Sequence, residues 1–181
     1  YTLALGRGRY TGTGFADVQE LYAGNAVQTG GSHITFGLDG LLYITVITAW
    51  HMPSFYDLAL QNRPVHIAEH FMFFGAALFY WWPLLSPSKE FPPASYAWQM
   101  LYLLAVIIGM TPVFAYITFS TDVLYPTYEY APRIVDGLSA AADQLLAGAM
   151  MKLIGMGVAM IAFGISFYRW FQASEARTGK K

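Results

Sequence analysis

Two histidines one helical turn apart are the first feature of this sequence that could do chemistry. His66 and His70 share one face if they lie on a helix, because residues four apart are neighbours on a helix surface. His51 precedes them, and Asp143 and Met150 lie seven residues apart later in the chain. Imidazole and thioether suit copper, and thioether in particular suits Cu(I). These residue types predict a Cu(I) site formed by His51, His66, His70, Met150 and Asp143.

Other interpretations of the same residues stay open. A histidine in a membrane helix can serve only as a hydrogen-bonding group between helices. The run from His66 to His70 also has the H-x-x-E-H spacing of some zinc hydrolases, with Glu69 as the base, but such an enzyme needs a third ligand and a position for water. A bis-histidine haem would need ligands from opposing helices, such as His66 and His51. We expect no haem and no enzymatic activity, since the sequence also lacks a nucleophile elbow, a P-loop and a dinucleotide-binding fingerprint.

The composition indicates which kind of molecule must position these side chains. The chain has 181 residues, of which 56% are hydrophobic and only 12% are charged. Ordinary soluble domains carry about 25% charged residues, so the chain is predicted to be an integral membrane protein. Its formal net charge of -1 provides no basic surface for nucleic acid, which we exclude as a partner. The absence of cysteine excludes disulfides, thiolate metal sites and thiol nucleophiles.

Four stretches of this chain are apolar over the length that a bilayer core requires, about 20 residues each. Their continuous apolar character favours helices over short alternating strands. The sequence therefore predicts an all-α, polytopic transmembrane bundle with about four spans in residues 34–168. A polar N-terminal segment, residues 1–33, precedes it without a signal-peptide pattern, and a basic tail, residues 169–181, follows it. The four predicted spans are residues 34–50, 65–85, 98–119 and 145–168.

The distribution of Lys and Arg predicts the orientation of these spans. Seven of them fall in the terminal regions and in the loop between the second and third spans, whereas the other two loops hold only Arg63 and Arg133. Basic residues collect on the cytoplasmic side, so both termini are expected there. This topology places His51, His66 and His70 near the outer face.

Two charged residues fall inside the predicted spans. Asp39 and Lys152 are expected at similar depths, about 16 and 13 Å below the outer boundary at a rise of 1.5 Å per residue. An unpaired charge in a bilayer is costly, so an ion pair forms if the first and last spans are neighbours. The alternative is that each charge is solvated alone, by a polar cavity or at an interface. Pro112 should in addition kink the third span.

The ordered motifs of residues 50–150 resemble those of the CtaG-type cytochrome c oxidase assembly factors. A first block runs from a W-H-x-P motif through Y-D and H-x-x-x-H to an aromatic run before proline. A second block joins an L-Y-P motif to a D-Q…G…M pattern. In this chain the two blocks are Trp50-His51-Met52-Pro53, Tyr56-Asp57, His66 and His70, Phe79-Tyr80-Trp81-Trp82-Pro83, then Leu124-Tyr125-Pro126 and Asp143-Gln144 with Gly148 and Met150.

This resemblance implies a multi-pass protein of the bacterial inner membrane that handles copper during assembly of a haem–copper terminal oxidase. Its partners would then be the lipid bilayer and the subunits of that oxidase or of another respiratory complex. The resemblance carries His51, His66, His70, Asp143 and Met150 over as residues related to copper. Family members usually have about seven spans, and this chain shows four. A family member with fewer spans could instead be a permanent structural accessory subunit without bound metal.

Overall fold

The computed structural model describes residues 32–133 and 135–178, and their side chains from Gly37 onward. All regular elements in these residues are helices, which confirms the predicted all-α class. The predicted N-terminal segment, residues 1–33, lies almost entirely outside the described residues. The elements are α3 (Ser32–Trp50), α4 (Pro53–Gln61), α5 (Arg63–Leu85), α6 (Tyr96–Gly109), α7 (Thr111–Phe119), α8 (Pro126–Glu129) and α9 (Ala140–Thr178).

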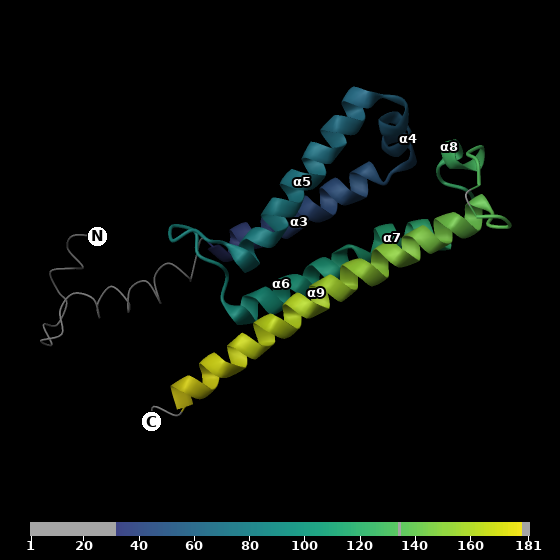
Figure 1. Ribbon diagram of the computed structural model, residues 1–181. Helices are drawn as coiled ribbons and strands as arrows, with labels where there is room; N and C mark the ends of the chain where they lie inside the picture. Colours follow the sequence, from purple (N-terminus) through teal and green to yellow (C-terminus); the bar gives the residue numbers. More distant parts are fainter. Residues whose placement is uncertain (1–31, 134, 179–181) are drawn as a thin grey trace, which may run out of the picture.

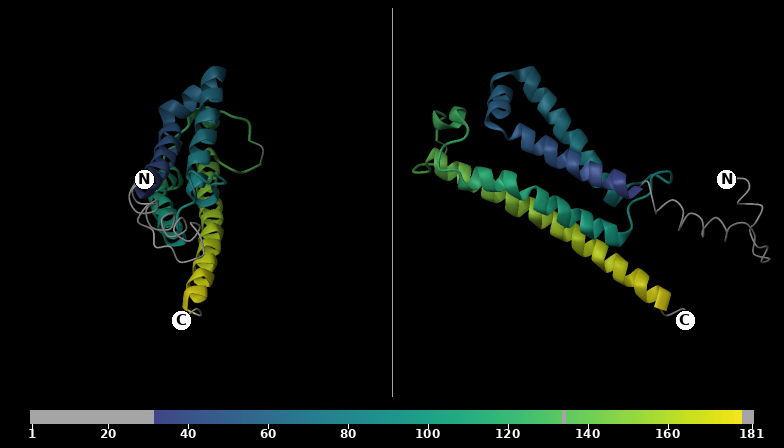
Figure 2. Two further views of the ribbon diagram at one scale, coloured as in Figure 1. Left: turned by 90° about the vertical axis from the view of Figure 1, so that its left-hand side faces the viewer. Right: turned by 180° about the vertical axis from the view of Figure 1, so that it is seen from behind.

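The helices form two groups that diverge from one end of the molecule. In the first group α3 packs against α5, and in the second α6 and α7 pack along α9 (Figure 1). The groups meet where α3 contacts α6, and the rear view in Figure 2 shows them separating toward α4 and α8. At this wide end α4 contacts α8, so a short helix from each group closes the opening.

Proline divides the third predicted span into two helices. Pro112 lies in the first turn of α7, where its missing N–H needs no partner, but its ring is incompatible with a straight continuation of α6. The hydroxyl of Thr111 donates to the carbonyl of Ile107 at 2.9 Å, which satisfies one of the acceptors released by the break. The predicted kink is therefore present, and the apolar run continues through it from Tyr96 to Phe119.

Two helical segments of the described chain are long and apolar enough to cross a membrane. They are Tyr96–Phe119, with 24 residues, and α9, with 39. Gly37–Trp50 within α3 is a shorter apolar helix, and α5 carries polar side chains in its first two turns. At 1.5 Å per residue α9 is about 58 Å long, almost twice the thickness of a bilayer core. The count of four spans stays a prediction.

The core of the second group is centred on Leu103, which is fully buried between α6 and its neighbours. Polar contacts fix α9 at two levels. The hydroxyl of Ser166 donates to Gln99 Oε1 at 2.8 Å, and Gln144 bonds with the backbone of Asp122 and Leu124 at the other end. Both amide side chains are buried, so each has partners where an unpaired amide would be costly.

The expected ion pair between Asp39 and Lys152 is not formed. The Lys152 ammonium donates to the carbonyl of Ile107 at 3.2 Å and to Thr111 Oγ1 at 2.8 Å. The physical reason is the packing order, because α3 packs against α5 and α6, whereas α9 packs against α6 and α7. Lys152 is instead solvated by the acceptors that the break before Pro112 makes available.

Candidate functional site

The two histidines of the H-x-x-x-H motif face each other at the start of α5. Asn62 caps this helix by accepting from the backbone N–H of Val65, and Pro64 occupies the first turn. His66 and His70 therefore lie one turn apart, with their Nε2 atoms separated by 3.0 Å and both side chains exposed. Of two neutral imidazoles in this contact, one nitrogen donates and the other accepts. When each ring carries its proton on Nδ1, both Nε2 lone pairs are available to one metal ion.

Glu69 lies beside His66, on the side of the ring that is turned away from His70. Its side chain is buried, and Oε2 lies 3.7 Å from Nδ1 of His66, the nitrogen that does not face His70. A carboxylate at that position orients the ring, as the outer partners of metal-binding histidines do. The hydrolase interpretation needs Glu69 beside a metal-bound water and a third ligand. In residues 32–133 and 135–178 no group of three or more His, Asp and Glu side chains is placed to hold a metal ion.

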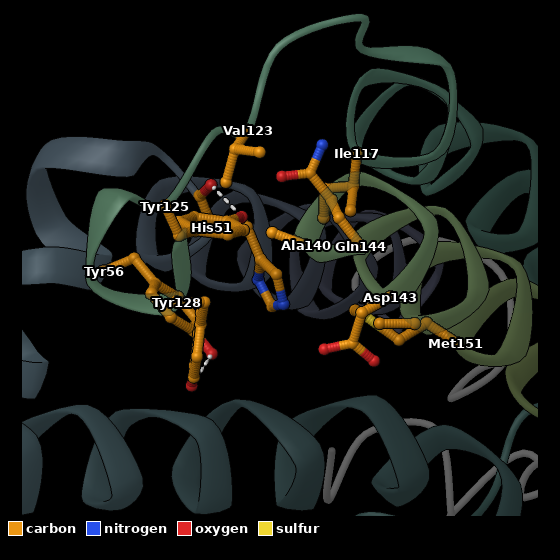
Figure 3. A pocket seen from close by; sticks show the side chains of 11 residues that line it. His51, Tyr56, Ile117, Val123, Tyr125, Tyr128, Ala140, Asp143, Gln144 and Met151 are labelled. Atoms are coloured by element: carbon orange, nitrogen blue, oxygen red, sulfur yellow. Dashed lines mark hydrogen bonds between the residues drawn. The ribbon is translucent and has the colours of Figure 1, made fainter. Parts of the chain in front are cut away.

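A second cluster surrounds His51 at the end of α3. The side chain lines a pocket of about 200 Å³ together with residues of α4, the segment between α7 and α8, α8 itself, and the start of α9. Figure 3 shows the imidazole of His51 and the carboxylate of Asp143 directed into this pocket from different elements. The thioether of Met151 also lines it, so an imidazole, a carboxylate and a soft sulfur atom share one cavity.

Two hydrogen bonds fix His51, one made by its imidazole ring and one by its backbone carbonyl group. Nδ1 lies 2.7 Å from the carbonyl oxygen of Ile47, one turn earlier in α3, and donates to it. The His51 carbonyl accepts a 2.9 Å hydrogen bond from the hydroxyl of Tyr125. With the proton on Nδ1, the lone pair of Nε2 is available to a ligand. A backbone acceptor on one nitrogen is the usual device that fixes the tautomer of a metal-binding histidine.

Tyrosines build the wall between this pocket and α4. The rings of Tyr56 and Tyr125 lie 4.2 Å apart, and the hydroxyls of Tyr56 and Tyr128 are 3.1 Å apart (Figure 3). Thr127 donates to Asp57 at 3.1 Å, which adds a second link between α8 and α4. Burial raises the pKa of Tyr125 to about 12 and raises that of Tyr56 further. Both phenols therefore stay protonated at physiological pH, and Tyr125 remains a donor to His51.

Residues 37–173 match the family model described as cytochrome c oxidase caa3 assembly factor (Caa3_CtaG). The chain belongs to this family. No curated protein and no solved structure matches the chain. The resemblance inferred from the motifs is confirmed, and the matched region of this CtaG family protein contains both histidine clusters.

The CtaG ligands predicted from sequence lie in two neighbouring places. His66 and His70 form the exposed pair, whereas His51 and Asp143 line the pocket. The two places are linked through α5, because the ring of Phe73, three residues after His70, lies 6.2 Å from that of His51. The three histidines do not converge on one point in the described structure.

Met150, the fifth predicted ligand, is half exposed and does not line the pocket. Its neighbour Met151 does. Gln144 is buried and lies on the face of α9 that lines the pocket. Met151 follows it by seven residues, which is two helical turns, so this spacing predicts that Met151 lies on the same face. Tyr125 was also missed as a site residue, although the L-Y-P motif contains it. Its contact with His51 bridges 74 positions of sequence, which spacing along one helix does not reveal.

Proposed function

We propose that this CtaG family protein is a non-enzymatic copper-binding factor in the assembly of a haem–copper oxidase. The observation that carries the copper proposal is the facing pair of Nε2 atoms, 3.0 Å apart, on the first two turns of α5. Two imidazoles are suitable ligands for Cu(I), which accepts low coordination numbers. Membership of a family of cytochrome c oxidase assembly factors supports the biological setting.

The exposure of the pair suits temporary binding of a cargo ion. Cu(I) would bind the Nε2 lone pairs of His66 and His70 after the proton between them has moved, through solvent, to the Nδ1 atom of the same ring, so that both imidazoles stay neutral. Both rings are open on the outside, so ligands of a target protein can approach the ion and replace the imidazoles one after the other. Glu69 keeps the His66 ring oriented during this exchange. A closed site with four protein ligands would retain its metal instead.

We further propose that the pocket around His51 is a second position for the same ion. His51 Nε2 and the Met151 sulfur would bind Cu(I) there, with Asp143 balancing its charge. The two positions are neighbours, because the ring of Phe73, three residues after His70 on α5, lies 6.2 Å from the ring of His51. Met150, which the sequence predicts as a ligand, is half exposed and does not line the pocket, and we assign the thioether role to Met151 in its place.

Copper binding to the purified full chain tests this proposal. Wild type, His66→Ala with His70→Ala, and Phe74→Ala as a matched control would be titrated with Cu(I) against a coloured chelator. Phe74 is exposed one turn beyond His70 and offers no ligand atom. The double variant should lose at least about tenfold in apparent affinity, whereas the control should not change. Unchanged copper binding in the double variant contradicts the assignment of the pair.

A second candidate function rests on the large apolar surface of α9. Only 11% of its most apolar window is buried within the described chain. A permanent accessory subunit of a respiratory complex would use such a face against lipid or a neighbouring subunit. Stable co-purification of the chain with a mature oxidase, without bound copper, would favour this function over the copper-binding one.

A further inference from the structure

A second cavity lies within the apolar part of the molecule, where the two groups of helices meet. It has a volume of about 210 Å³ and receives side chains from α3, α5, α6, α7 and α9. No residue of the predicted copper positions lines it. Its walls include Tyr43, Tyr80, Trp81, Phe114, Lys152 and Met156.

Aromatic rings form the greater part of one wall of this cavity. Tyr43 and Tyr80 are stacked with centroids 4.7 Å apart, and Trp81 meets Tyr80 edge to face at 5.0 Å. Tyr80 is only 7% exposed, so its ring is fixed between its neighbours. Rigid aromatic faces favour a flat ring as a ligand, because stacked and edge contacts add to the burial of apolar area.

The polar groups of the cavity include one group that can only donate, the Lys152 ammonium, and two tyrosine hydroxyls that can donate or accept. Lys152 has three ammonium hydrogens, of which two are accounted for by Ile107 and Thr111. The hydroxyls of Tyr43 and Tyr80 have no hydrogen-bond partner in the part of the chain that the structure describes, although Tyr80 is buried. No carboxylate lines the cavity. A ligand that matches it must therefore bring acceptor oxygens.

We propose that this cavity binds the ring of a membrane quinone. A quinone is a flat ring with carbonyl acceptors at opposite ends and no donor, and it reaches such a cavity from the bilayer. Lys152 would donate to one carbonyl and Tyr80 to the other, between the aromatic walls. Drug-sized ligands need pockets of about 300–1,000 Å³, so 210 Å³ suits a single substituted ring rather than a macrocycle.

The donor set also determines which oxidation state is favoured. The reduced form, a quinol, carries two hydroxyl donors. An ammonium cannot accept a hydrogen bond from a hydroxyl. The oxygen of a quinol can still accept from Lys152, but its hydroxyl hydrogen finds no acceptor on the ammonium, so the site should bind the oxidised ring more tightly than the reduced ring. This inference does not depend on copper binding.

Quenching of tryptophan fluorescence in the full chain, reconstituted in lipid nanodiscs, tests the proposal. The probe is a ubiquinone with a single isoprene unit, and Trp81 reports on the cavity. Lys152→Met and Tyr80→Phe should each raise the dissociation constant about tenfold, because each removes one donor. Tyr168→Phe, an exposed α9 position outside the cavity, is the matched control and should bind as wild type. Circular dichroism and gel filtration verify that each variant is folded.

The outcomes separate the quinone from other occupants. Lys152→Arg keeps the charge and should bind more tightly than Lys152→Met. Equal binding by wild type, Lys152→Met and Tyr80→Phe overturns the proposal. Displacement of the probe by oleate at equal concentration, with sensitivity to Lys152 but not to Tyr80, overturns it in favour of a long-chain carboxylate. Equal affinity for quinone and quinol contradicts the assigned donors.

Discussion

The tautomer of His51 illustrates how a single residue is prepared for binding. Its Nδ1 is committed to the carbonyl of Ile47, so that only Nε2 faces the pocket shared with Asp143 and Met151. A histidine that served only to join helices would be expected to bond through the nitrogen that points between them. Here the bond to Ile47 lies within α3, and the other nitrogen is left available.

Two adjacent methionines provide a matched test of the pocket. Met151 lines it, whereas Met150 is half exposed and does not. Met151→Leu should lower the Cu(I) affinity of a chain that already lacks His66 and His70, by about tenfold, because leucine keeps the volume but has no sulfur. Met150→Leu in the same background should have no effect. Chelator competition measures both, and an equal loss in the two variants would show that the thioether assignment is wrong.

The phenol of Tyr125 makes a prediction for alkaline pH. Burial raises its pKa to about 12, from an ordinary value of about 10. Between pH 10 and 12 the unfolded chain releases a proton that the folded chain retains, so folding stability falls as pH rises through this window. Tyr125→Phe should show a shallower fall there, after a loss of about 1 kcal/mol at pH 7 from its bond to His51. Thermal unfolding in detergent at a series of pH values measures both effects.

At the scale of the helices, α7 and α9 are tightly packed against each other at Gly148. A Cβ atom at this position would collide with the side chain of Thr118 and approach the backbone. Gly148 is also the glycine of the D-Q…G…M pattern, so the motif that resembles the family has a packing reason in this chain. The close approach brings Asp143 and Met151 on α9 to the pocket wall that Ile117 of α7 forms.

Substitution of glycine by alanine should therefore have opposite effects at two positions of α9. Gly148→Ala should destabilise the protein by about 1–3 kcal/mol, because α7 must move away. Gly155→Ala meets open space and should be neutral or stabilise the helix by up to about 1 kcal/mol. Unfolding midpoints of the two variants in one detergent give the comparison. A similar loss at both positions would mean that helix packing at Gly148 is not the cause.

The sequence predicted some of these elements better than others. The apolar stretch 98–119 and the effect of Pro112 on it can be predicted, because the length of an apolar run and the presence of a proline are both properties of a short piece of sequence. The segment between His51 and His66 was expected to be a loop, and it contains α4, whose first turn starts at Pro53. Its nine residues are fewer than an isolated helix needs to be stable, and contacts with α5 and α8 stabilise them.

The grouping of whole helices was beyond sequence reasoning. The spacing of His66 and His70 fixes their shared face, and the structure has them in contact. The expected convergence of His51 on that pair, and the pairing of Asp39 with Lys152, both required a particular arrangement of helices in space. Those distances depend on the divergence of the two groups, which no residue pattern along one helix encodes.

The absence of native cysteine makes the predicted orientation directly testable. Tyr130→Cys, in the exposed segment after α8, should react with a membrane-impermeant maleimide added to intact spheroplasts. Lys89→Cys, between α5 and α6, should react only after the membrane is opened. This pattern follows if both termini are cytoplasmic and four spans cross the bilayer. Labelling of both positions from the same side would contradict the four-span topology.

The uninterrupted α9 links the pocket to the basic residues near its C-terminal end through one continuous helix. One end carries Asp143 at the pocket, and the other carries Arg169 and Arg177, which lie about 39 and 51 Å from Asp143 along the helix at 1.5 Å per residue. A tilt of only about 10° about one end displaces the other by about 10 Å. A movement of the basic end that α9 followed as a rigid rod would therefore also move Asp143 at the pocket, without a relay of side chains.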